Sequence, residues 1–90
     1  MADERRRAER HETSRVGKIS GGGLPNPVEC IVSDVSTTGA LLVFREEVRV
    51  PNAFTLRIAG IARSFECEVR RRGPQTLGVR FTSQTDLRMA

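Results

Sequence analysis

The sequence predicts an all-β fold: a small antiparallel β-barrel with a polar N-terminal arm and a short C-terminal tail. Three observations lead to this fold class. Apolar side chains recur at every second position in several short segments, as in strands that have one face in a core and one in water. Clusters of Gly, Pro, Asn, Asp and Ser separate these segments, and no segment between them has the pattern of a helix. Closure into a barrel would remove the exposed edges of so small a sheet.

The N-terminal arm comprises residues 1–14, in which almost every side chain is polar. A segment with so little apolar surface to bury is expected to be flexible. The barrel is predicted over residues 15–82. Residues 83–90 form a tail that is too short to be an independent element.

The strands follow in order along the barrel. Val16 and Ile19 break the alternation around Gly17, which predicts a bulge or bend in the first strand. The turns are expected at residues 21–27, 34–39, 45–52, 59–63 and 73–75. The side chains predicted to face the core in the later strands are Val28, Cys30, Val32, Ala40, Leu42, Phe44, Phe54, Leu56, Ile58, Phe65, Cys67, Val69, Leu77, Val79 and Phe81.

Length and composition limit the class of protein. Ninety residues, of which 38% are hydrophobic, provide one compact core. No apolar run approaches the roughly 20 residues of a membrane span, and the charged N-terminus does not resemble a secretory signal, so we expect a cytoplasmic protein. The net charge of +4 and the pI near 10.4 favour an anionic partner without choosing among nucleic acid, lipid and phosphorylated ligand.

The sequence indicates neither a metal site nor an enzyme. Cys30 and Cys67 lie far apart and form no C-x-x-C pair, so both are expected to be reduced and structural. His11 is the single histidine, whereas a zinc site needs several nitrogen or sulfur ligands. No nucleophile has an identifiable base, and Asp34 has no evident carboxylate partner.

One turn is rich in short oxygen-bearing side chains: Asp34-Val35-Ser36-Thr37-Thr38-Gly39. Asp and Ser bind nearby backbone amides, and Gly39 would supply a positive φ, so one interpretation of the segment is a turn and nothing more. Alternatively, its carboxylate and hydroxyl form a rigid polar ledge, where the glycine lets a ligand approach the backbone.

The N-terminal arm carries a second motif, because Arg6 and Arg10 are four residues apart and project to one side of a helical turn. Guanidinium groups bind phosphate in a bidentate manner, stack on flat rings and read guanine through O6 and N7. The alternative is a solvated basic tail that the neighbouring glutamates neutralise.

Taken together, these motifs resemble the PilZ domain family. The sequence has R-x-x-x-R at Arg6 and Arg10, then D-x-S-x-x-G at Asp34, Ser36 and Gly39. Near its end, residues 77–81 (LGVRF) are similar to the G-V-x-F ending of that family. The resemblance covers nearly the whole chain, and it implies a six-stranded β-barrel that binds the bacterial second messenger cyclic di-GMP, with no cofactor besides this ligand.

The resemblance also implies a role for each motif. Arg6 and Arg10 would bind phosphates and the Hoogsteen edges of guanine, while Asp34 and Ser36 would hold the ligand from the turn that Gly39 shapes. The arm would fold over the ligand on binding and relay the signal to an unidentified downstream protein. The family suggests control of motility, adhesion or exopolysaccharide production.

Other basic residues have weaker assignments. Arg5 and Arg7 would add electrostatic attraction only. The run 70–72 is most simply a solvated strand end, or else a second anionic contact beside the ligand.

Two other functions remain open: a PilZ-like adaptor that has lost nucleotide binding, and a basic barrel that binds single-stranded nucleic acid. The second usually requires exposed aromatic side chains. Here Trp and Tyr are absent and the phenylalanines occupy core positions, so nucleic acid is not the expected partner.

Overall fold

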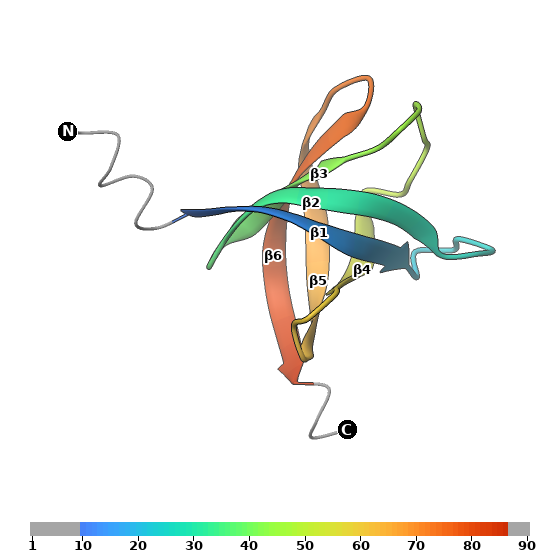
Figure 1. Ribbon diagram of the computed structural model, residues 1–90. Coiled ribbons are helices and arrows are strands. Elements are labelled where there is room, and N and C mark those ends of the chain that lie inside the picture. The colour runs from blue at the N-terminus through green and yellow to red at the C-terminus, as the bar shows by residue number, and fades with distance from the viewer. Residues whose placement is uncertain (1–9, 87–90) are drawn as a thin grey trace.

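The computed structural model describes residues 10–86, and in this part of the chain it has six strands and no helix, which confirms the predicted fold class. The strands form a closed antiparallel barrel in the order β1-β2-β3-β6-β5-β4 (Figure 1). Their bounds are β1 (Arg10–Ser20), β2 (Val28–Ser36), β3 (Gly39–Val43), β4 (Ala53–Ile58), β5 (Arg63–Arg72) and β6 (Thr76–Asp86).

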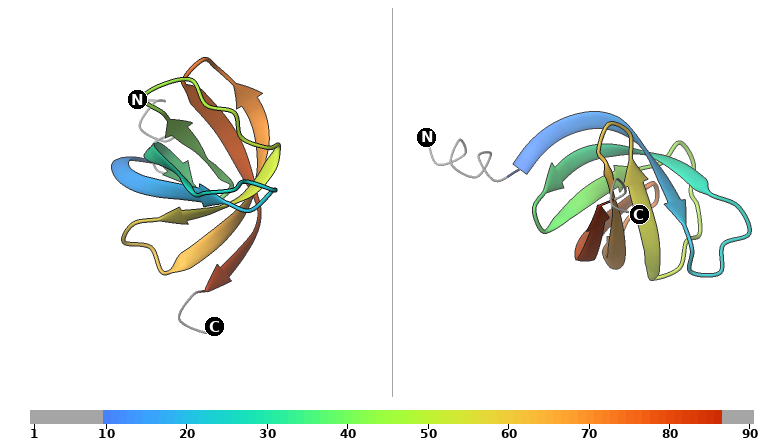
Figure 2. Two further views of the ribbon diagram at one scale, coloured as in Figure 1. Left: turned by 90° about the vertical axis from the view of Figure 1, so that its right-hand side faces the viewer. Right: turned by 90° about the horizontal axis from the view of Figure 1, so that it is seen from below.

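The strands enclose one apolar core. β1 and β2 cross in front of β5 and β6 at a steep angle in Figure 1, and the two views of Figure 2 show the sheet curling around its interior. Most of the side chains predicted to face inward are buried, whereas Val28, Ala40, Val69 and Phe81 are half-buried and pack against the core from its margin. The buried residues are Ile19, Cys30, Val32, Leu42, Phe44, Val50, Phe54, Leu56, Ile58, Phe65, Cys67, Leu77 and Val79.

The first strand is irregular, but not at the predicted place. Gly17 and Ile19 both face the core, and Val16 points outward with 41% of its surface exposed, so the alternation continues through Gly17. The register shift against β2 lies earlier, between Glu12 and Arg15. Gly17 faces the core at a position with no room for a side chain, because a Cβ there would lie 2.8 Å from Cγ2 of Val32.

The barrel extends further along the chain than the range 15–82 expected from the sequence. β1 begins at Arg10 and β6 ends at Asp86. These end segments are polar, and the backbone ladders hold them: residues 10–12 pair with 34–36 of β2, and residues 83–86 pair with 63–66 of β5. Alternation of apolar residues cannot reveal such a strand end, because nothing apolar alternates there.

The barrel closes between β1 and β4 through a short ladder. Gly17–Ser20 pair with Thr55–Ile58, and the amide of Ala59 donates to the carbonyl of Val16 at 2.9 Å. Arg15 adds a side-chain bond across the same junction, from Nη1 to the carbonyl oxygen of Ala59 at 3.0 Å. This closing seam lies on the opposite side of the strand order from β3 and β6.

Candidate functional site

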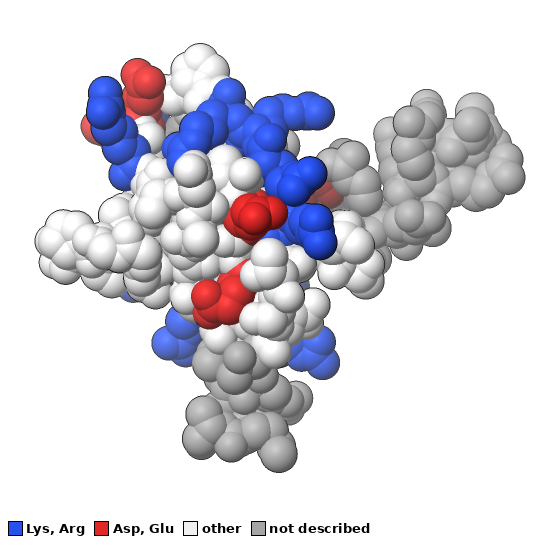
Figure 3. Space-filling view, turned by 180° about the vertical axis from the view of Figure 1, so that it is seen from behind, with Lys and Arg blue, Asp and Glu red and all other residues white. Residues whose placement is uncertain are grey.

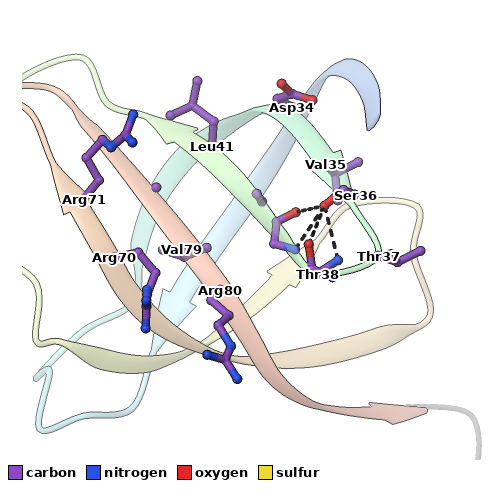
Figure 4. Close-up of a pocket in the computed structure, with 13 residues that line it drawn as sticks. Asp34, Val35, Ser36, Thr37, Thr38, Leu41, Arg70, Arg71, Val79 and Arg80 are labelled. Carbon is purple, nitrogen blue, oxygen red and sulfur yellow. Dashed lines mark hydrogen bonds between the residues drawn. The ribbon is translucent and has the colours of Figure 1, made fainter. Parts of the chain in front are cut away.

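A hollow of about 660 Å³ lies on the outer face of the barrel, over β2, β3, β6 and β5; we call it the groove. One side is formed by residues 34–41, which run from the end of β2 through the turn into β3. Figure 4 shows the other side, where arginines of β5 and β6 approach the same hollow. The residues of that side are Arg70, Arg71, Gly78, Val79 and Arg80.

Strand register explains why these distant segments meet. Asp34 pairs with Leu41, Leu41 pairs with Gly78, and Gly78 pairs with Arg71. Residues paired directly across neighbouring strands point to the same face of a sheet. A single row across four strands therefore places a carboxylate at one edge of the groove and a guanidinium at the other.

The β2–β3 connection is tighter than the sequence suggested. β2 continues to Ser36 and β3 starts at Gly39, so that only Thr37 and Thr38 form the turn, and Asp34 is a strand residue. Ser36 Oγ accepts hydrogen bonds from the amides of Thr38 and Gly39, both at 3.2 Å. It also lies 3.2 Å from Thr38 Oγ1 and 3.3 Å from the Gly39 carbonyl oxygen. A hydroxyl has one proton and two lone pairs, so the turn itself uses the full capacity of Ser36.

The reason given above for Gly39 was wrong. The glycines with positive φ in the part of the chain that the structure describes are Gly21, Gly22, Gly23 and Gly60. Gly39 is required for a different reason, since a Cβ there would overlap the carbonyl oxygen of Val79 on the neighbouring strand. The missing side chain allows β3 and β6 to approach, and so it helps to build the groove from behind.

The register of β1 brings the two sequence motifs together at Arg10. This residue pairs with Ser36, and Glu12 pairs with Asp34, so the C-terminal end of R-x-x-x-R begins the strand beside the D-x-S-x-x-G segment. Arg5, Arg6 and Arg7 lie outside the described residues.

Sequence reasoning gave the β5 arginines on the far side of the groove two interpretations, and the less simple one was a second anionic contact beside the ligand. Arg70 and Arg71 were most simply a solvated strand end, and Arg80 was not singled out. Figure 3 shows Lys and Arg side chains gathered on the back of the molecule as seen in Figure 1, where β5 and β6 lie. A β5–β6 pairing read from the turn at 73–75 would place Arg80 near the run 70–72, but it would not show which of these residues face outward.

Arg72 belongs to a different place. Its Nη2 donates to the carbonyl oxygen of Val50 at 2.9 Å and to Oδ1 of Asn52 at 2.7 Å. It therefore ties β5 to the loop between β3 and β4, beside a second hollow of about 410 Å³. The run of three arginines thus divides into two that line the groove and one that fastens a loop.

The remaining titratable groups of interest are the two thiols. Cys30 and Cys67 are free and buried, as expected. Burial, and after it the charge of Glu29, raises the pKa of Cys30 to about 11. Burial, then Glu66 and Cys30, raises the pKa of Cys67 to about 12. Within residues 10–86 there is no group of three His, Cys, Asp or Glu side chains placed to hold a metal ion.

No stretch between residues 10 and 86 forms a helix that is long and apolar enough to span a membrane.

Comparison with known proteins gives one match. Neither a curated protein nor a solved structure matches the chain. The family model described as PilZ domain matches residues 4–89. PilZ domains are known as binding modules for cyclic di-GMP rather than as enzymes. Because this match spans nearly all of the sequence and the barrel is the one expected, the chain belongs to the PilZ domain family.

Proposed function

We propose that this chain is a cyclic di-GMP receptor that binds the dinucleotide in the groove. The observation that carries the proposal is the groove itself: in a chain of the PilZ family, it joins the D-x-S-x-x-G segment to three arginines. Its volume of about 660 Å³ falls within the roughly 300–1,000 Å³ of small-molecule sites.

The chemistry of the two sides suits this ligand. Cyclic di-GMP carries two phosphodiesters and two guanines. Guanidinium groups bind phosphate with paired N–H donors and match the O6 and N7 acceptors of guanine. The half-buried carboxylate of Asp34 would accept hydrogen bonds from the N–H groups of a guanine. Ser36 acts through the turn, because its hydroxyl holds the amides of Thr38 and Gly39 in place.

The N-terminal arm would complete the site. Arg6 and Arg10 bind phosphate and the guanine edges in this proposal, while Arg5 and Arg7 contribute attraction without specific contacts. The pairing of Arg10 with Ser36 supports it, since this register places the start of β1 beside the D-x-S-x-x-G segment that lines the groove. Ordering of the arm over the ligand would then present a changed surface to a downstream protein in the cytoplasm, in a pathway of motility or exopolysaccharide control.

A calorimetric titration of the purified chain with cyclic di-GMP tests this function. We expect saturable binding that GTP and a short single-stranded DNA do not reproduce. Replacing Arg6 or Arg10 by Ala should each cost about 1.5–3 kcal/mol, since each change removes charge-assisted hydrogen bonds. This loss corresponds to a Kd roughly 10- to 150-fold weaker.

Arg5→Ala is the matched control, because it removes the same charge from the same arm. Its loss should be much smaller and largely confined to low salt. Equal losses at Arg5, Arg6 and Arg10 would indicate a diffuse basic surface instead of a specific site. Absence of binding to cyclic di-GMP would favour an adaptor of the same fold, and preference for DNA would favour the nucleic-acid alternative.

A further inference from the structure

We propose that Arg70, Arg71 and Arg80 form a second anion-binding half-site, which binds a phosphate diester of the ligand from the β5–β6 side of the groove without help from the N-terminal arm. The identity of the ligand rests on the function proposed above. The half-site itself follows from the geometry of three arginines and one glycine on two neighbouring strands.

A β-bulge brings two consecutive arginines to one face. Successive residues of a regular strand point to opposite faces, so Arg70 and Arg71 would ordinarily diverge. In the β5–β6 ladder, Val69 pairs with Val79 and Arg71 with Gly78, which leaves Arg70 as an extra residue. A bulge of this kind redirects side chains, and here both arginines line the groove. Figure 4 shows them on the same side of the hollow as Arg80.

The charge of this cluster is compensated only in part, by Glu68, which forms an ion pair with Arg70 and is paired in the strand register with Arg80. Arg70 Nη1 lies 3.3 Å from Oε1 of Glu68, in an exposed ion pair. Within residues 10–86, neither Arg71 nor Arg80 forms an ion pair or a side-chain hydrogen bond. Three guanidinium groups around one hollow repel each other, and a bound phosphate would replace that repulsion with charge-assisted hydrogen bonds.

The floor between these arginines is a glycine that the fold does not require. Gly78 does not have a positive φ. Away from its chain neighbours, a Cβ added there would meet only the Cβ of Arg71, at the ordinary contact distance of 3.5 Å. Because a glycine inside a strand weakens that strand and often marks the close approach of a ligand, we assign Gly78 as the place where the ligand reaches the backbone of β6.

Arg72 shows why the cluster is not simply a basic strand end. This next residue of the same run is held by Val50 and Asn52, and it lies outside the groove. Only those arginines that the bulge and the register direct outward are available to an anion.

The experiment combines two probes. The first is a calorimetric titration of the full chain with cyclic di-GMP, using Arg71→Ala, Arg80→Ala and Gly78→Leu. The matched control is Arg57→Ala, which removes an exposed arginine of β4 outside the groove. We expect Kd to weaken by about 10-fold or more for the first three variants and by less than about 2-fold for Arg57→Ala. In an Arg6→Ala/Arg10→Ala background, Arg71→Ala should weaken the remaining binding further.

The second probe is inorganic pyrophosphate, followed by the arginine Nε–H signals and the Gly78 amide in NMR spectra of the full chain. We expect shifts at Arg70, Arg71, Arg80 and Gly78 but none at Arg57. Thermal melting by circular dichroism checks that each variant is folded.

The outcomes separate this inference from the function on which it builds. Binding of cyclic di-GMP that is unchanged by Arg71→Ala and Arg80→Ala would overturn the half-site and leave the receptor function standing. Pyrophosphate shifts confined to the cluster, in a chain that does not bind the dinucleotide, would support the half-site and overturn the receptor function. Pyrophosphate shifts spread over all arginines would overturn the half-site whatever the dinucleotide does.

Discussion

At the scale of single residues, two glycines that border the groove have opposite meanings. Gly39 has no room for a side chain because Val79 of the next strand occupies that space, whereas Gly78 has room and faces the groove. In the sequence the two glycines look alike, but only Gly78 leaves open space that suits the approach of a ligand. The difference depends on contacts between segments about 40 positions apart, which no local pattern records.

Alanine substitution distinguishes these two roles. Gly39→Ala should destabilise the fold by about 1–3 kcal/mol, the usual cost of overpacking. Gly78→Ala should instead stabilise it by about 0.5–1 kcal/mol, because alanine loses less conformational entropy in a strand. Urea unfolding followed by far-UV circular dichroism measures both, since the chain has no Trp or Tyr for fluorescence. If Gly78→Ala proved as damaging as Gly39→Ala, the fold itself would require both glycines.

Ser36 lines the groove, but the structure uses its hydroxyl within the turn. The D-x-S-x-x-G pattern placed Asp34, Ser36 and Gly39 in one site, and the structure brings all three to the groove. Yet the Ser36 hydroxyl closes the turn. The two interpretations drawn from the sequence, turn and ledge, are thus compatible, because the turn positions the ledge.

At the scale of elements, the regular strands were predictable and their irregularities were not. Alternation identified the inward residues of β4 and the first half of β5, because each has one apolar and one polar face. The bulge at Arg70 could not be found in the same way, since residues 70–72 are three identical side chains and carry no alternation. The polar start of β1 was missed for a related reason: backbone pairing with β2 holds it, not apolar burial.

The loop between β3 and β4 provides a prediction at this scale. Arg72→Ala removes the bonds to Val50 and Asn52 that fasten this loop to β5. We expect a loss of about 1–2 kcal/mol in the free energy of unfolding and faster amide exchange across residues 45–52, measured by mass spectrometry. The affinity for cyclic di-GMP should stay within about 2-fold of the parent chain.

Arg71→Ala is the counterpart in the same run, and it should show the reverse pattern: the Kd for cyclic di-GMP weakens by about 10-fold or more, while residues 45–52 keep their protection from amide exchange. A variant at Arg72 that lost ligand binding without loosening the loop would contradict the division of this run into groove and loop residues.

At the scale of the whole molecule, the barrel and its single core were predictable because composition, turn spacing and alternation agree. The assembly of the groove was only half predictable. Its β2–β3 side is a contiguous motif, while its β5–β6 side depends on the strand order that places β6 beside β3. The adjacency of β3 and β6 results from the closure of the whole sheet, so it is not recorded in any local segment of the sequence.

The buried thiols make stability depend on pH in the alkaline range. Burial raises the pKa of Cys30 to about 11 and that of Cys67 to about 12, from an ordinary value of 9.0. In the unfolded chain the thiols lose their protons near pH 9, so the unfolded state binds fewer protons and the free energy of unfolding falls as pH rises from about 9 toward 12. The stabilisation is complete below about pH 8.

We expect a loss of about 3 kcal/mol by pH 10, measured by urea unfolding. A Cys30→Ala/Cys67→Ala variant should lose most of this dependence on pH, because it lacks both buried thiols and the chain has no Tyr. If the free energy of unfolding of this double variant still fell with pH as steeply as that of the parent chain, groups other than the thiols would be the cause.

The short seam between β1 and β4 determines where the barrel is expected to open locally. Local opening is easiest where few contacts hold two elements together, and among neighbouring strands of the barrel β1 and β4 have the least contact, through Gly17–Ser20 and Thr55–Ile58. When this seam parts, β2, β3, β6 and β5 still form a continuous four-strand sheet, and these are the strands that carry the groove. The barrel can therefore open between β1 and β4 while the groove keeps its shape.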